Sequence, residues 1–98
     1  MIEAARQTLI HEAEALKTAI SSVAGVTCGE VSIDFALDGV DFVLPIVKGG
    51  RKAEACEFCC DGRKVYDLRY DEGDCDGWTN DYVDDDTLDG LVRLVRNF

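Results

Sequence analysis

The sequence is 98 residues long, 47% of its residues are hydrophobic, and its formal net charge is −10. A chain of this length is expected to form a single domain, residues 1–98, whose core is just large enough to fold without disulfides or a structural metal. The negative charge argues against direct binding to nucleic acid, because the phosphate backbone would repel it. A basic protein surface is the more natural partner.

No stretch approaches the roughly 18 apolar residues that a membrane helix needs, and the N-terminus lacks the pattern of a secretory signal. The five cysteines are an odd number, so at least one thiol stays unpaired within a monomer. Free thiols are typical of a reducing compartment. We therefore expect a soluble cytoplasmic protein, monomeric or homodimeric, with no membrane partner.

Apolar residues recur every three or four positions in the N-terminal segment, which predicts a helix from about Ile2 to Ser22. Gly25 is expected to end this segment. The predicted apolar stripe of the helix consists of Ile2, Ala5, Leu9, Ala13, Leu16, Ile20 and Val23.

From Glu30 the apolar period changes to two, and Asp38-Gly39 separates two alternating runs, which predicts a β-hairpin. A turn at these two residues pairs Leu37 with Val40. Pro45 has no N–H for the ladder, so the second strand is expected to lie near an edge or a bulge there. One face of the hairpin then carries Val31, Ile33, Phe35, Leu37, Val40, Phe42, Leu44 and Ile46.

Residues 48–51 predict a second turn, which a third strand follows near residues 52–60. Asp61-Gly62 repeats the hairpin signal, and a fourth strand is predicted at about residues 63–70. The corresponding register pairs Phe58 with Val65 and also Ala55 with Leu68. Because these pairs fall on opposite faces, either a bulge or a sheet buried on both sides is expected.

Residues 71–86 are rich in Asp and Gly and are predicted to form a long loop. A short helix follows, with Asp86 as the predicted N-cap. Its apolar stripe consists of Leu88, Leu91, Val92, Val95 and Phe98. The predicted fold class is therefore α+β: an N-terminal helix, a four-stranded antiparallel meander and a C-terminal helix, with the helices on one face of the sheet.

The cysteines were tested as a metal site. Cys56 and Cys59 form a C-x-x-C pair, and Cys28 and Cys75 could complete a zinc site. However, two positions three apart in a strand point to opposite faces. Free cysteines also occur commonly as small buried hydrophobic residues. No metal is therefore predicted, and zinc binding stays an alternative.

Calcium binding by the acidic loop is a second metal hypothesis. With Gly77 at the sixth position of a calcium loop, Asp74, Asp76 and Asn80 fall at positions that supply oxygen ligands. The end positions do not fit, because Val83 stands where a bidentate glutamate belongs. We therefore predict no cofactor.

Catalytic motifs are absent from the sequence. His11 is the only histidine, and we expect it to be a solvated helix residue. There is no nucleophile elbow, phosphate loop or paired-histidine zinc motif. Paired carboxylates are plentiful, but no pattern singles out one with a raised pKa. We therefore expect a protein that is not an enzyme.

The segment 71–89, here called the acidic stretch, contains nine carboxylates and no Lys or Arg. Aromatic residues within a charged rim are typical of protein-binding surfaces. The alternative is that Trp78 closes the core and the aspartates are solvated turn residues. The predicted partner-binding residues are Asp71, Glu72, Asp74, Asp76, Trp78, Asp81, Tyr82, Asp84, Asp85 and Asp86.

In size, acidity, α+β layout and lack of a catalytic motif, the chain resembles the small inhibitor proteins that phages encode, of which anti-CRISPR proteins are the largest group. The resemblance implies a stoichiometric inhibitor in the host cytoplasm. Such a protein docks on a basic nucleic-acid-binding site of a host defence complex and can act as a DNA mimic. No functional residue carries over from it.

Three alternatives to this function stay open. The first is an immunity or antitoxin protein that neutralises a basic nuclease. The second is a small zinc- or calcium-binding module. The third is a homo-oligomeric structural protein, which would pair through the strand edge near Pro45 or through the apolar C-terminal helix.

Overall fold

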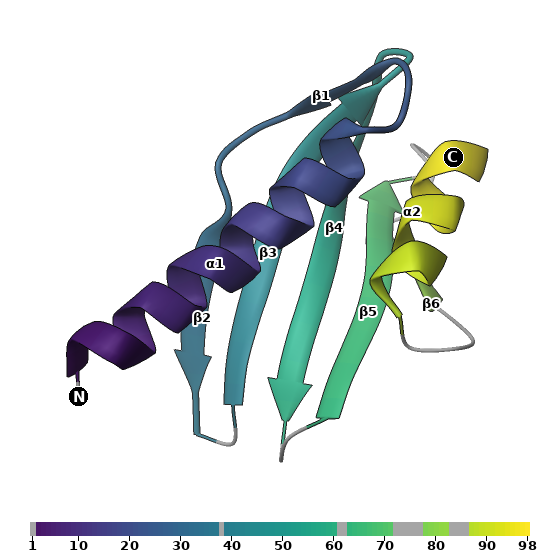
Figure 1. Cartoon of the computed structure of the whole chain (residues 1–98). Coiled ribbons are helices and arrows are strands. Elements are labelled where there is room, and N and C mark those ends of the chain that lie inside the picture. Colours follow the sequence, from purple (N-terminus) through teal and green to yellow (C-terminus); the bar gives the residue numbers. More distant parts are fainter. Residues whose placement is uncertain (1, 38, 61–62, 72–77, 83–86) are drawn as a thin grey trace.

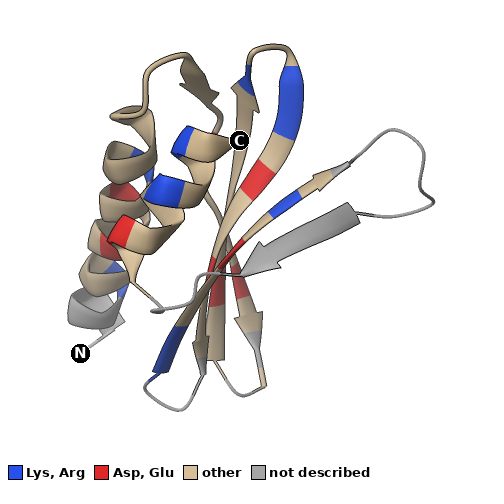
Figure 2. Ribbon diagram, turned by 90° about the vertical axis from the view of Figure 1, so that its right-hand side faces the viewer, with Lys and Arg blue, Asp and Glu red and all other residues tan. Residues whose placement is uncertain are grey.

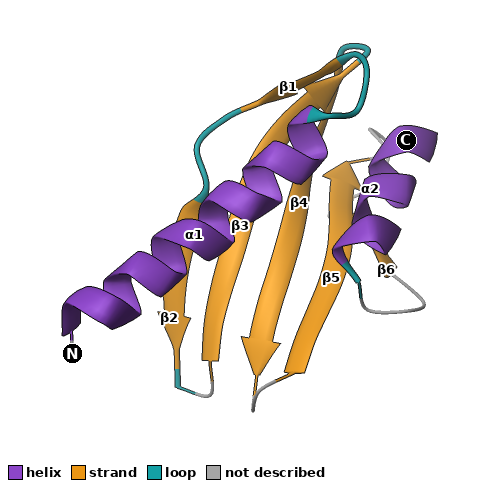
Figure 3. Ribbon diagram, in the orientation of Figure 1, coloured by secondary structure: helices purple, strands orange, loops and turns teal. Residues whose placement is uncertain are grey.

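The computed structural model describes residues 2–37, 39–60, 63–71, 78–82 and 87–98, of which 2–5, 36, 60, 71 and 78–82 are described by their backbone alone. Two helices lie on one face of an antiparallel sheet (Figures 1, 2 and 3). This arrangement confirms the predicted α+β class. The helices are α1 (Ile2–Ser21) and α2 (Leu88–Asn97), and the strands are β1 (Val26–Cys28), β2 (Ser32–Ala36), β3 (Gly39–Lys48), β4 (Arg51–Cys60), β5 (Arg63–Asp71) and β6 (Trp78–Tyr82).

The sheet has the order β1-β3-β4-β5-β6, and β2 also pairs with β3. The four predicted strands are confirmed as β2 to β5, whereas β1 and β6 were not predicted. The prediction that residues 71–86 form one loop is wrong, because β6 pairs with residues 67–71 of β5. Its sequence, Trp-Thr-Asn-Asp-Tyr, has no run of alternating apolar residues. It becomes a strand because it bonds along an existing strand edge.

The β2–β3 hairpin differs from the predicted register by two residues. Phe35 pairs with Val40 and Ala36 pairs with Gly39, so the paired residues end at Ala36 and Gly39, and Leu37 does not pair with Val40. Because the shift is an even number of residues, the same side chains still share one face. The apolar alternation therefore predicted correctly which side chains share a face, whereas the predicted position of the turn was wrong.

Pro45 is not in an edge strand, because β3 has neighbours on both sides. It lies opposite the break between β1 and β2, and its carbonyl oxygen accepts a hydrogen bond of 2.8 Å from the Gly29 N–H. The N and C=O of one strand residue point to the same side, so the missing N–H of Pro45 faces this break. The break thus accommodates proline without loss of a ladder bond.

The β4–β5 register confirms the predicted pairs of Phe58 with Val65 and Ala55 with Leu68. It continues without a bulge from Ala53 to Cys60. Cys56 and Asp67 are buried on the face away from the helices, while Ala55 and Leu68 are buried on the helix side. Of the two alternatives, the sheet buried on both sides is therefore correct at this place.

The hydrophobic core lies between the two helices and the sheet. The helices contact each other, and α2 also packs on β5. No helix in the described ranges is long and apolar enough to cross a membrane. Since Leu91 and Val95 of α2 are fully buried, the apolar stripe of this helix is not free to pair with another copy. The core consists of Leu16, Ile20, Val23, Phe42, Leu44, Ile46, Ala53, Ala55, Tyr66, Leu68, Leu91 and Val95.

The N-cap of α2 is Thr87 and not Asp86, which lies outside the described residues. Thr87 has extended backbone angles, and its Oγ1 accepts a 3.0 Å hydrogen bond from the Gly90 N–H. Thr87→Ala should therefore lower the free energy of unfolding by about 1 kcal/mol. Urea titration monitored by circular dichroism measures this, with Thr87→Ser as the control that keeps the hydroxyl. Equal stability of wild type and Thr87→Ala would contradict this role.

The turn between β3 and β4 holds the C-terminal end of α2. Lys48 Nζ donates hydrogen bonds of 3.0 Å and 2.6 Å to the carbonyl oxygens of Val95 and Arg96. Arg51 donates one of 2.7 Å to Phe98 O, and its guanidinium lies 3.9 Å from the centroid of the Phe98 ring. Cations at the negative end of the helix dipole stabilise it. These contacts therefore lock α2 onto the sheet.

Candidate functional site

The acidic stretch is only partly within the described residues. Asp71 ends β5, whereas Trp78, Asp81 and Tyr82 belong to β6. In register, Trp78 stands opposite Asp71, Asp81 opposite Leu68 and Tyr82 opposite Asp67. The predicted residues Glu72, Asp74, Asp76, Asp84, Asp85 and Asp86 lie outside the described residues, as do Cys75 and Gly77 of the metal hypotheses.

The acidic stretch reaches one edge of the sheet through β6. Within the described ranges, β6 pairs only with β5, and it is the last strand of the sheet order. The stretch begins at the end of β5 and ends at Asp89, an exposed residue in the first turn of α2. Of its predicted binding residues, Trp78, Asp81 and Tyr82 therefore lie in the edge strand on the side of the sheet opposite β2.

The negative charge of the protein is concentrated in this stretch. Outside residues 71–89 the chain carries eleven Asp and Glu and ten Lys and Arg, so it is nearly neutral. Figure 2 shows both signs of charge distributed over the described helices and strands. Nine of the ten net negative charges therefore belong to one segment of nineteen residues.

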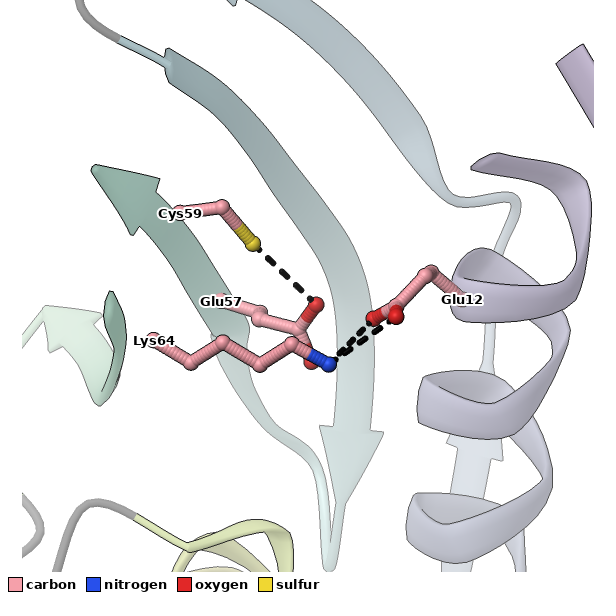
Figure 4. A network of polar contacts seen from close by, with 4 residues as sticks. All are labelled: Glu12, Glu57, Cys59 and Lys64. Carbon is pink, nitrogen blue, oxygen red and sulfur yellow. Dashed lines mark hydrogen bonds and ion pairs between the residues drawn. The ribbon is translucent and has the colours of Figure 1, made fainter. Parts of the chain in front are cut away.

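A second polar group, which the sequence did not reveal, lies between α1 and the sheet (Figure 4). Lys64 Nζ on β5 donates hydrogen bonds of 2.9 Å and 2.8 Å to both carboxylate oxygens of Glu12 on α1. Cys59 Sγ lies 3.7 Å from Glu57 Oε2 on β4. Glu12, Glu57, Cys59 and Lys64, here called the α1–sheet network, join three elements.

Burial separates the pKa values of the two glutamates in this network. Glu57 is only 3% exposed, and loss of hydration raises its pKa, to which its hydrogen bond with Glu12 adds. The hydrogen bond from Lys64 lowers the pKa of Glu12. Of the two carboxyl groups, Glu57 is therefore the one that binds a proton more readily, and Glu12 the one that ionises more readily.

The network borders a cavity of about 280 Å³ that is also lined by His11, Thr8, Tyr66 and Leu88. Two carboxyl groups with divergent pKa values are a pattern of acid–base catalysis. However, burial raises the pKa of the Cys59 thiol to about 11 and also raises that of Tyr66, so neither is an activated nucleophile. Lys64 and Glu12 already neutralise each other. The network thus serves mainly to fasten α1 to the sheet.

The C-x-x-C pair cannot hold one zinc ion in this fold. Cys56 is fully buried on the face away from the helices, whereas Cys59 packs against the core on the helix side. Cys28 lies in β1, where its Sγ is 3.3 Å from Ser21 Oγ. No group of three metal-ligating side chains is present in the part of the chain that the structure describes. Cys56 and Cys59 are three positions apart in β4, and side chains at this spacing in a strand point to opposite faces of the sheet.

The sheet face away from the helices has its own buried polar row. Arg69 Nε donates a 3.2 Å hydrogen bond to Cys56 Sγ, and the guanidinium lies 3.5 Å from Glu54 Oε1. Burial raises the pKa of Cys56 to about 12, so its thiol stays protonated. Asp67 is 1% exposed, its pKa is raised by burial, and its Oδ1 has no hydrogen-bond partner. The row thus holds a protonated thiol and one buried carboxyl oxygen without a hydrogen bond, and no activated nucleophile.

No family model, curated protein or solved structure matches this chain. The proposed function therefore depends on the charges and geometry of the chain itself.

Proposed function

We propose that this protein is a non-catalytic inhibitor that acts in the cytoplasm by docking its acidic stretch on a basic, nucleic-acid-binding site of another protein. The single observation that carries the proposal is the segregation of charge. A chain that needed charge only for solubility would not require nine negative charges in residues 71–89 and near neutrality elsewhere. The resemblance to phage-encoded inhibitors agrees with this function.

The position of β6 supports the same proposal. It attaches the middle of the acidic stretch to the sheet edge, so Trp78, Asp81 and Tyr82 have an ordered backbone between the flanking aspartates. Nine carboxylates within nineteen residues present a negative potential that attracts a basic surface and speeds association. Carboxylates at the spacing of phosphates can also occupy a groove that otherwise holds nucleic acid.

The first experiment identifies the partner by a pull-down from the native host with mass spectrometry. The proposal expects a basic nucleic-acid-binding protein, and nucleic acid should compete with this chain for it. If the partner is a nuclease toxin, the same surface serves an immunity protein. Capture of a partner that has no basic site would contradict the proposal.

The second experiment measures affinity for that partner by calorimetry. The triple variant Asp84→Asn, Asp85→Asn, Asp86→Asn should weaken binding about tenfold or more, and raised salt should weaken the wild type. The matched control changes three exposed carboxylates elsewhere: Glu14→Gln, Glu30→Gln, Asp34→Asn. It alters net charge equally and should retain most of the affinity. Equal losses in both variants would show that overall charge, and not the acidic stretch, drives binding.

A further inference from the structure

The strand β2 has an edge without a strand partner. It pairs with β3 along its whole length from Ser32 to Ala36. On its other side, no strand pairs with it among the residues that the structure describes. Unpaired N–H and C=O groups of such an edge can bond to a strand from another molecule.

The apolar row of β2 continues from the core into solvent. Val31 and Ile33 pack against the core, whereas Phe35 is 74% exposed and Leu37 is fully exposed. Figure 1 shows the reason, since α1 crosses the sheet diagonally and the turn end of β2 and β3 extends beyond it. The apolar row therefore extends beyond the core at Phe35 and Leu37.

A groove of about 290 Å³ runs beside this row, between α1 and β2. Ile10 on its rim is 39% exposed. An apolar strip with a polar rim, next to an open strand edge, has the character of a protein interface. The groove is lined by Ile10, Ala13, Glu14, Lys17, Glu30, Val31 and Ile33.

We propose that the β2 edge is the interface of a symmetric homodimer. The charge distribution selects a second copy as the occupant. Two chains of net charge −10 repel each other, but outside residues 71–89 each chain is nearly neutral. Contact through β2 leaves β6, the described strand of the acidic stretch, at the opposite edge of each sheet. The groove rim carries both signs of charge, Glu14 and Glu30 beside Lys17, so it adds little net repulsion between two copies.

The sequence of β2 also selects the register of the pairing. A two-fold axis at Asp34 would place two carboxylates directly opposite each other, which is unfavourable. An axis at Phe35 instead pairs Phe35 with its own copy and Ile33 with Leu37 of the second copy. This register keeps all apolar side chains on one face. It joins the two sheets into one continuous sheet with a copy of β6 at each end.

Sedimentation equilibrium of the purified chain tests this interface, from about 1 µM to about 1 mM. Wild type should dimerise reversibly, and raised salt should strengthen the dimer because it screens the repulsion. Phe35→Asp should be monomeric at every concentration, since it places two carboxylates on the two-fold axis. The matched control Val47→Asp changes another exposed apolar residue, on the face away from the helices, and should dimerise like wild type.

Circular dichroism of each variant checks that the fold is retained. If Phe35→Asp is misfolded, Leu37→Asp replaces it as the test, because the Leu37 side chain is fully exposed and contributes no core contact. A wild type that stays monomeric up to the highest concentration would overturn the proposal. A dimer that persists in the folded variant would overturn it too, because it would place the interface elsewhere.

Discussion

Glu57→Gln should make the protein more stable at neutral pH, by roughly 1–3 kcal/mol, the cost of a poorly compensated buried polar group. Glu57 is buried between α1 and the sheet and forms hydrogen bonds with Glu12 and Tyr66. A glutamine amide can donate to Glu12 and accept from Tyr66, as the protonated acid does. The variant thus keeps the contacts and removes the ionisable group.

The pH dependence of this effect has a definite sign. Folding raises the pKa of Glu57 above its ordinary value of 4.5. Glu57 therefore contributes its full stability below pH 4.5, and this contribution is lost as pH rises through the raised pKa. Glu12 has a lowered pKa and behaves in the opposite way, since its contribution is lost as pH falls through that lowered value. The advantage of the variant should vanish near pH 4 and grow toward neutral pH.

Urea unfolding at several pH values between 4 and 8 measures this difference. Glu14→Gln, an exposed change of the same kind on α1, is the matched control and should leave stability nearly unchanged. If the difference between Glu57→Gln and wild type were the same at every pH, the raised pKa of Glu57 would be wrong.

Leu68→Ala should lower the free energy of unfolding by about 2–5 kcal/mol, because it leaves a cavity where β5 meets α2. Leu68 is 1% exposed and belongs to the core cluster that includes Leu91 and Val95. Small domains are stable by only about 5–15 kcal/mol, so the loss is a large part of the total. Thermal and urea unfolding both report it.

Leu37→Ala is the matched control for this truncation, since it removes the same atoms from a fully exposed side chain. At a concentration where the protein is monomeric, it should change the free energy of unfolding by about 0.5 kcal/mol or less. A loss as large as that of Leu68→Ala would show that Leu37 is buried in solution.

Local patterns were sufficient to predict α1, α2 and the strands β2 to β5. The helical spacing of Leu9, Leu16 and Ile20 marked the buried side of α1, and Asp61-Gly62 gave the β4–β5 register. Alternation could not show that Phe35 and Leu37 would be exposed. Their exposure depends on the angle at which α1 crosses the sheet, which is a property of the whole fold.

Features that join distant parts of the chain were not predictable. Glu12 and Lys64 are 52 residues apart, and Lys48 reaches Arg96 O across 48 residues. No local pattern marks such pairs, because each residue looks like an ordinary surface charge. The strand β6 was missed for a related reason, since its neighbour supplies the bonds that make it a strand.

The sequence predicted which segment carries the candidate site, but not where that segment joins the sheet. The concentration of charge between Asp71 and Asp89 is visible in the sequence, whereas the attachment of Trp78–Tyr82 to the sheet edge required the fold. The role of these residues in binding stays a prediction. The zinc hypothesis for Cys56 and Cys59 is excluded for the reason that the strand pattern already indicated, since the two side chains lie on opposite faces of the sheet.

The contact between α1 and α2 has a consequence for how the protein folds during synthesis. The meander strands pair with sequence neighbours and can form early, but α1 completes its packing only against the most C-terminal element described. At about 5–20 residues per second, the apolar face of α1 remains incompletely covered for several seconds on the ribosome. Lys48 and Arg51 can form their hydrogen bonds to the carbonyl oxygens of Arg96 and Phe98 only after α2 has been synthesised. We therefore expect the packing of α1 against α2 to be among the last steps in folding of the domain.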